Sequence, residues 1–196
     1  HSPRVPAKVS TDGLETTWGE RWESEGTYAF DRSAERAEVF SIDTPPPTVS
    51  GSLHVGHVFS YTHTDTVARF QRMRGKAVFY PMGWDDNGLP TERRVQNYFG
   101  VRCDPSLPYD PDFTPPHTGG EGKSIKARDQ VPVSRRNFVE LCERLTVEDE
   151  KQFEALWRRL GLSVDWSHTY QTIGERARKV AQTAFLHNLE RGEAYQ

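Results

Sequence analysis

The sequence is short of cysteine and of long apolar stretches, and each shortage excludes a class of protein. Its two cysteines, Cys103 and Cys142, stand at no metal-binding or redox spacing, so we expect free thiols in a reducing compartment. No apolar run approaches the roughly 18 residues that a membrane span requires, and no secretory leader is evident. The sequence therefore predicts a cytoplasmic protein that neither crosses a membrane nor is exported.

A strong excess of charge is also missing. The chain has 25 Lys and Arg against 28 Asp and Glu, for a formal net charge of −3, which argues against a strongly basic nucleic-acid-binding module. Three arginine pairs are expected to lie on solvated helix faces rather than to bind tRNA. They are Arg93–Arg94, Arg135–Arg136 and Arg158–Arg159. With 35% hydrophobic residues and a mean hydropathy of −0.76, the chain is polar for an isolated domain, as expected if it packs against other segments.

The chain is organised around residues 39–75. Residues 39–44 are rich in β-branched and aromatic side chains and predict a central strand buried on both faces. Three prolines at 45–47 must end that strand, because they lack a backbone donor and restrict the residue before each of them. From Leu53 to Gly75, apolar residues recur at helical spacing and predict a long helix. These apolar positions are Val55, Val58, Phe59, Val67 and Phe70.

His54 and His57 lie at the predicted start of this helix, where unpaired backbone N–H groups and the positive end of the helix dipole favour an anion. Gly51 and Gly56 would let a nucleotide approach the backbone, and imidazoles can donate to phosphate oxygens. Two other interpretations of the pair are surface histidines and half of a metal site. The metal interpretation is disfavoured, since no cysteine is near and the H-E-x-x-H pattern is absent.

A second strand is predicted at residues 76–81, parallel to the first if the intervening helix crosses over in the usual sense. Ligands of open parallel sheets bind beyond the carboxyl ends of the strands, so residues 45–57 and 83–87 should face one crevice. There Asp85 can pair with the α-ammonium of an amino acid, while Gly83 leaves room for the backbone to turn. For Asp86 a loop-capping role is expected.

The remaining segments are predicted as packing elements. Asp12 and Glu15 resemble a capping pair for an amphipathic helix in which Leu14, Trp18 and Trp22 face the core. Further helices are predicted from Pro90 to Gly100, from Ser134, and from Thr146, which together with Asp149 starts the next one. A last helix is predicted from Gly174 to Arg191, with Val180, Ala181, Ala184 and Leu189 inward, and residues 104–124 are expected to form a long irregular loop.

Two blocks resemble a known family. PPPTVSGSLHVGH, residues 45–57, resembles the first signature of class I aminoacyl-tRNA synthetases, and GWDDNGLPTER, residues 83–93, resembles the second block of their valyl, isoleucyl and leucyl subgroup. The resemblance implies an α/β fold, the N-terminal half of a Rossmann-type parallel-sheet catalytic domain with added helices. It divides the chain into an N-terminal helix and extension at 1–35 and the first half of the catalytic domain at 36–196, ending before the editing insertion.

Within the subgroup, residues 48–53 resemble the valyl pattern, and residues 86–93 its archaeal-type branch. This implies a monomer that acts on valine, ATP with Mg²⁺, and tRNA(Val). Gly51, His54, Gly56 and His57 would bind ATP, with both histidines catalytic. Pro46, Thr48 and Asp85 would bind the amino acid, although Thr48 departs from the asparagine common in bacterial valyl enzymes. The resemblance implies no resident metal site. The alternatives are an isoleucyl enzyme, a small nucleotidyltransferase and a non-catalytic interaction module.

Overall fold

The computed structural model describes residues 10–50, 53–119 and 125–196. In this part of the chain every strand pair is parallel: β1 (Val39–Ser41) with β2 (Ala77–Phe79), β3 (Met82–Trp84) with β6 (Thr169–Gln171), and β4 (Val101–Cys103) with β5 (Val131–Val133). The predicted parallel pairing of the first two strands and the α/β class are confirmed. The first strand is shorter than predicted and only half-buried.

Helix α2 (Val55–Met73) connects β1 to β2 and forms where predicted, but it presents the opposite face to the core. Its buried residues are Tyr61, Asp65 and Ala68, whereas Val55, Phe59, Val67 and Phe70 are exposed. The reason is a polar network: Asp65 pairs with Arg69 and accepts from the backbone and hydroxyl of Ser163. Buried polar groups whose hydrogen bonds are satisfied are compatible with a core. Here they, rather than the apolar periodicity, decide which face of α2 is buried.

Helix α4 (Arg135–Arg159) is one continuous helix, so the predicted break before a second helix at Thr146 is wrong. The Thr146 hydroxyl donates to the carbonyl of Glu143, within the helix, and Asp149 pairs with Arg94 of a neighbouring helix. Neither residue is therefore used as a cap. Ser134 does cap α4, since its hydroxyl accepts from the Asn137 N–H.

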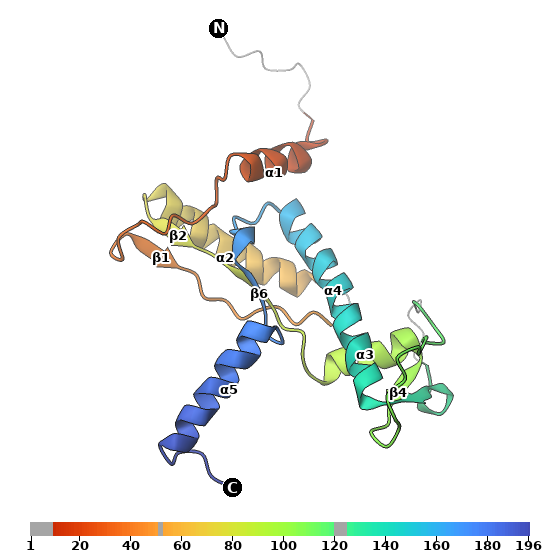
Figure 1. The fold of residues 1–196 in the computed structure, drawn as a ribbon. Helices are drawn as coiled ribbons and strands as arrows, with labels where there is room; N and C mark the ends of the chain where they lie inside the picture. The colour runs from red at the N-terminus through yellow and green to blue at the C-terminus, as the bar shows by residue number, and fades with distance from the viewer. Residues whose placement is uncertain (1–9, 51–52, 120–124) are drawn as a thin grey trace.

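Helix α3 (Leu89–Phe99) ends at Gly100 as predicted, with a positive φ of 68° at the glycine. It packs against α4 and β4, and Figure 1 shows these elements gathered at one end of α4. The segment from Asp104 to Gly119 contains no helix or strand, and the remainder of the predicted loop, 120–124, lies outside the described residues. Short 3₁₀ turns occupy Ala127–Asp129 and Trp166–His168.

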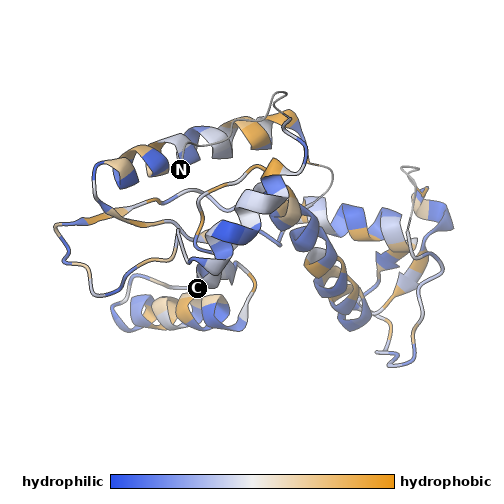
Figure 2. Cartoon of the chain, turned by 90° about the horizontal axis from the view of Figure 1, so that it is seen from above, coloured by the Kyte–Doolittle hydropathy of each residue, from blue (hydrophilic) through white to orange (hydrophobic). Residues whose placement is uncertain are grey.

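The first and last helices are more exposed than the sequence suggests. Helix α1 (Leu14–Ser24) begins after Gly13 without a side-chain cap, so the predicted capping pair is wrong, and Leu14 and Trp18 are exposed. Helix α5 (Glu175–Glu190) buries none of its residues, contrary to the prediction of an inward apolar face. In Figure 2, hydrophobic residues are interspersed with hydrophilic ones along the helices. An apolar periodicity alone does not decide what a helix packs against.

None of the helices in the described ranges combines the length and the apolar character that a membrane crossing demands.

Candidate active site

The loop after β1 and the end of β3 are joined by a short parallel bridge between Thr48 and Asp85. The Asp85 N–H donates to the Pro47 carbonyl at 2.9 Å, and the Val49 N–H donates to the Asp85 carbonyl at 2.9 Å. Val49 itself is fully buried. The two predicted segments of the amino-acid site therefore lie side by side at the carboxyl ends of the parallel strands, where ligands of such sheets bind.

The half-buried Asp85 carboxylate is held by two hydroxyl groups from opposite sides. The Thr48 hydroxyl donates to Oδ2 at 3.2 Å, and the Thr172 hydroxyl donates to Oδ1 at 3.4 Å. Thr172 follows β6, and sequence reasoning missed it because it is far from Asp85 along the chain. Both bonds are long, so the carboxylate keeps capacity to accept from a cationic ligand. Pro46, the third residue predicted to bind the amino acid, is half-buried in the same loop.

His54 and His57 come together at the start of α2, with ring centroids 3.9 Å apart. Both rings also serve as caps: His54 Nδ1 accepts from the Gly56 N–H at 3.2 Å, and His57 Nδ1 accepts from the His54 N–H at 3.4 Å. Some of the N–H groups that the sequence assigned to an anion are thus already used. Burial, and then the charge of His54, lowers the pKa of His57.

The histidine pair and the Asp85 turn approach each other around one aromatic side chain. Phe153 of α4 packs edge-on against the His57 ring, with centroids 5.6 Å apart, and against Trp84 of β3 at 6.5 Å. Trp84 immediately precedes Asp85. Phe153 is 2% exposed and therefore fixes both groups to one core. The predicted ATP contact Gly51 lies outside the described residues.

Glycine is needed at positions 83 and 56 for two different structural reasons. A Cβ on Gly83, within β3, would overlap the ring of Tyr170 on the neighbouring β6, so glycine is required there by packing across the strands rather than by a turn. A Cβ on Gly56 would lie 2.9 Å from Cε1 of His54. The absence of a side chain at Gly56 therefore allows the His54 ring to fold back over the helix start.

Asp86 does not cap a loop, so that prediction is wrong. Its side chain is 3% exposed, and within the described chain neither carboxylate oxygen meets a hydrogen-bond donor. Burial, then Glu150, and then the charge of Asp85 together raise the pKa of Asp86 to about 7. No sequence pattern pointed to this pairing of Asp86 with Glu150, because the two residues belong to different elements.

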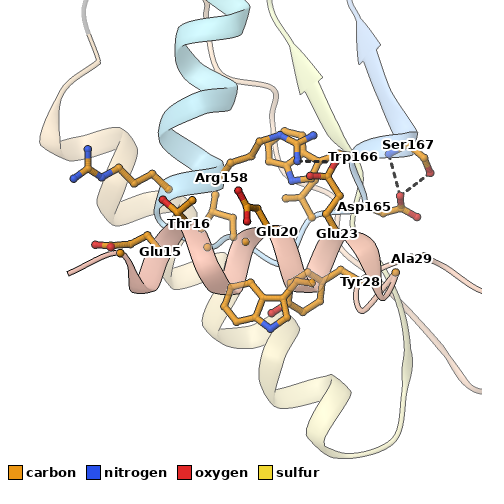
Figure 3. Close-up of a pocket in the computed structure, with 18 residues that line it drawn as sticks. Glu15, Thr16, Glu20, Glu23, Tyr28, Ala29, Arg158, Asp165, Trp166 and Ser167 are labelled. Atoms are coloured by element: carbon orange, nitrogen blue, oxygen red, sulfur yellow. Dashed lines mark hydrogen bonds and ion pairs between the residues drawn. The ribbon is translucent and has the colours of Figure 1, made fainter. Parts of the chain in front are cut away.

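The described residues contain no group of three or more His, Cys, Asp and Glu side chains that could hold a metal ion. Cys103 and Cys142 are free thiols, as predicted. A cavity of about 750 Å³ lies between α1 and the C-terminal end of α4, bordered by Trp22, Arg158 and Trp166 (Figure 3). It is lined by none of the described site residues, and the ion pair Glu23–Arg158 at 3.3 Å spans it.

Comparison with known proteins identifies the relatives of the chain. Residues 17–106 match the family model of tRNA synthetases class I (I, L, M and V). The chain is 72% identical over 196 residues to a valine–tRNA ligase of Leifsonia xyli subsp. xyli, and 72% identical over 191 residues to one of Thermobifida fusca. These matches cover 98% and 97% of this chain, but 23% and 21% of the relatives. The chain thus spans about a fifth of the length of these curated relatives.

A solved structure shows the same fold. The agnB2 LeuRS of Agrobacterium radiobacter K84, in a ternary complex with tRNA and LeuAMS, matches with a TM-score of 0.65 at 23% identity. The match covers 93% of this chain and 18% of the other. Since the identity is low, this likeness establishes the fold alone.

The chain therefore contains part of a class I tRNA synthetase domain, at residues 17–106. Within that class it is homologous to the valine–tRNA ligases, at about 70% identity over nearly its whole length. The isoleucyl enzymes and the small nucleotidyltransferases are therefore not favoured. The relatives named here are bacterial, so the predicted resemblance to the archaeal-type branch is not confirmed.

Proposed function

We propose that the chain forms the first half of the active site of a valine–tRNA ligase, which activates valine with ATP and transfers it to tRNA(Val). The observation that carries this proposal is the 72% identity to valine–tRNA ligases along nearly the whole chain. The bridge between Thr48 and Asp85 and the stacked histidines add a geometric basis.

In the proposed reaction, the valine carboxylate attacks the α-phosphorus of ATP, forming valyl-adenylate and releasing pyrophosphate. Asp85 would pair with the α-ammonium of valine, while Pro46 and Thr48 border its side chain. His54 and His57 would donate to phosphate oxygens whose negative charge grows in the transition state. Gly51 and Gly56 would allow ATP close to the backbone. Catalysis would rest on positioning and charge stabilisation.

Mg²⁺ would arrive with the ATP phosphates, whose charge it neutralises when bound. No side chain of this chain is assigned to it, because the described residues contain no suitable ligand cluster. The division at residues 35–36 and the position of an editing insertion after Gln196 remain predictions from the resemblance.

A chimera tests this proposal: the 196 residues replace the matching segment of the Thermobifida fusca valine–tRNA ligase. It should catalyse valine-dependent exchange of pyrophosphate into ATP, with isoleucine, leucine and threonine as weaker substrates. Loss of a phosphate donor typically costs about 3 kcal/mol, so His57→Ala should lower kcat by on the order of 100-fold. His63→Ala, an exposed histidine on the same helix, is the matched control. A chimera that favours another amino acid, or whose kcat is unchanged in His57→Ala, would contradict the assignment.

The 196-residue chain alone should activate valine poorly, since it spans only about a fifth of its relatives. Exchange at the rate of the intact Thermobifida fusca enzyme would show that this half of the site is sufficient.

A further inference from the structure

Asp86 is a buried carboxyl group that receives no hydrogen bond from the described residues. The side chain is 3% exposed, and both carboxylate oxygens are without a donor in the part of the chain that the structure describes. An ionised carboxylate in such a place is strongly unfavourable, so it tends to take up a proton. Glu150 of α4 brings a second carboxyl group to this turn: it raises the pKa of Asp86, and it accepts from Gln171, the residue before the threonine that binds the Asp86 N–H. Two ionised carboxylates in contact repel, whereas one protonated member donates to the other.

We propose that Asp86 and Glu150 form a proton-sharing carboxyl pair, in which Asp86 carries the proton, and that this pair positions the turn bearing Asp85. The proton turns one of the two unpartnered Asp86 oxygens into a donor for Glu150. The sharing of the proton is independent of the proposed function. Only the consequence for Asp85 as an amino-acid ligand rests on it.

The pair joins three elements at the turn. Glu150 Oε1 of α4 also accepts from Nε2 of Gln171, the last residue of β6, at 2.6 Å. The next residue, Thr172, accepts from the Asp86 N–H at 3.3 Å and donates to Asp85 Oδ1 at 3.4 Å. The amide of Asn87 also donates to this hydroxyl, at 3.2 Å. The threonine hydroxyl therefore accepts twice and donates once, its full capacity.

Several charged groups face the pair. Asp85, from the same turn, raises the pKa of Asp86, after burial and Glu150. On α4, burial raises the pKa of Glu150, and the charge of Glu154 adds to the rise. Gln171 and Asp86, as donors to Glu150, oppose that rise. Among the described residues, the charged groups that shift the pKa of either acid are carboxylates, so a proton, rather than a cationic side chain, relieves the repulsion.

The first experiment titrates Asp86 directly in the 196-residue chain. With ¹³C-labelled aspartate carboxyl groups, and the Asp86 signal assigned by its loss in Asp86→Asn, the midpoint is expected near pH 7. Glu150→Gln removes the neighbouring charge and should shift the Asp86 midpoint toward the ordinary value. Glu148→Gln, an exposed glutamate of α4 paired with Lys151, is the matched control and should leave it unchanged. A wild-type midpoint near 4, or one insensitive to Glu150→Gln, would overturn the pair.

The second experiment detects the same proton through the pH dependence of the melting temperature. The pKa of Asp86 is higher in the folded state than in the unfolded chain, so the folded state takes up a proton between about pH 4 and 7. Stability from this group is therefore present at low pH and is lost as the pH rises toward 7. Asp86→Asn, which mimics the protonated acid, should keep the fold and flatten the decline in melting temperature between about pH 4 and 7. An unchanged slope in Asp86→Asn would contradict the proposal.

The third experiment tests the positioning of Asp85. Valine is titrated into the labelled chain while the Asp85 carboxyl signal is followed. Asp86→Asn should bind valine as the wild type does, whereas Asp86→Ala should lose on the order of ten-fold in affinity and shift the Asp85 signal before valine is added. Equal affinity in Asp86→Ala would overturn the positioning role. If the wild type itself shows no response to valine, the proposed function fails at this site, while the Asp86 midpoint still decides whether the proton is shared.

Discussion

Helix α4 carries two hydrophobic clusters that differ in chemistry. The site cluster lies along its C-terminal half and includes Phe153 and Trp157, while the distal cluster lies along its N-terminal half and includes Phe138 and Leu141. The other buried members of the site cluster are Ile42, Val49, Tyr61, Ala68, Val78, Tyr80, Met82, Trp84, Leu162 and Val164, and those of the distal cluster are Val95, Phe99, Val101, Val133 and Leu145.

The site cluster is rich in large aromatic side chains with polar atoms, and two of these, the Tyr80 hydroxyl and the Trp157 Nε1, are buried without a partner among the described residues. Asp86 adds a third such side chain next to this cluster. The distal cluster contains Phe and aliphatic side chains, and none of its described residues has an orphaned polar atom. An orphaned polar group costs stability. Three of the four described side chains with such an atom therefore lie in or next to the site cluster, while the fourth, Thr91, lies on α3 one turn before Val95 of the distal cluster.

The largest effect is expected from Trp157→Ala. Trp157 is fully buried and packs against Tyr61 and Phe153, at centroid distances of 4.9 and 6.1 Å. Its truncation should lower the free energy of unfolding by about 3–5 kcal/mol in chemical denaturation. It should also shift the NMR signals of His57, which touches Phe153. Phe99→Ala in the distal cluster is the control: it should also destabilise, without moving the His57 signals. If both variants shift the His57 signals equally, the two clusters are structurally coupled and the distinction between them is wrong.

Arg94→Met comes next. Arg94 of α3 donates twice to the buried Asp149 of α4, at 2.5 and 2.7 Å, and this bidentate pair joins the two helices. Removing the guanidinium leaves Asp149 buried and uncompensated, so the free energy of unfolding should fall by about 2–3 kcal/mol. The exposed neighbour Arg93→Met should change it by less than about 0.5 kcal/mol. Urea denaturation of both variants measures the difference, and equal values would mean that the ion pair contributes nothing.

A smaller effect is expected from pH at the start of α2. Because the pKa of His57 is lower in the folded state, the folded state prefers the neutral ring, and stability from this group is lost as the pH falls from about 6.5 through the lower pKa of the folded state. Protonation also removes the acceptor for the His54 N–H, a cap of about 1 kcal/mol. Amide exchange in the first turn should therefore be faster at pH 5 than expected from its intrinsic rate. His57→Gln should remove this pH dependence and His63→Gln should not; retention in His57→Gln would place its origin elsewhere.

Gly56→Ala should have the smallest effect on stability. The new Cβ would displace the exposed His54 ring and weaken the cap by about 1 kcal/mol, while alanine favours a helix over glycine by a similar amount. The net change in unfolding free energy should stay within about 0.5 kcal/mol. The His54 ring signals should nevertheless shift, and ATP should bind the chain more weakly. A loss of several kcal/mol would show that the ring cannot move aside.

The sequence predicted the parts of the fold that local chemistry decides. The first two strands flank a helix of the length a crossover needs, and Gly100 must end α3 because it adopts a positive φ. The core face of α2 could not be predicted, since it depends on Ser163, far along the chain, which satisfies Asp65. The continuity of α4 likewise depends on Arg94, which engages the acid expected to start a new helix.

The same distinction applies to the candidate site. His54, His57, Thr48 and Asp85 lie in two compact sequence blocks, and the structure brings each block together. Thr172 and Glu150 were missed because neither follows a motif, and each reaches the Asp85–Asp86 turn from a different element. Asp86 was misjudged because a polar residue in a turn usually caps it.

The capping role of the two imidazoles has a consequence for which proton each ring presents. Each Nδ1 accepts a backbone N–H, so in the neutral ring this nitrogen has no hydrogen and the remaining hydrogen sits on Nε2. The backbone thereby selects the tautomer of both rings. Each ring is left with an outward-facing N–H donor, which suits an anionic oxygen even when the ring carries no positive charge.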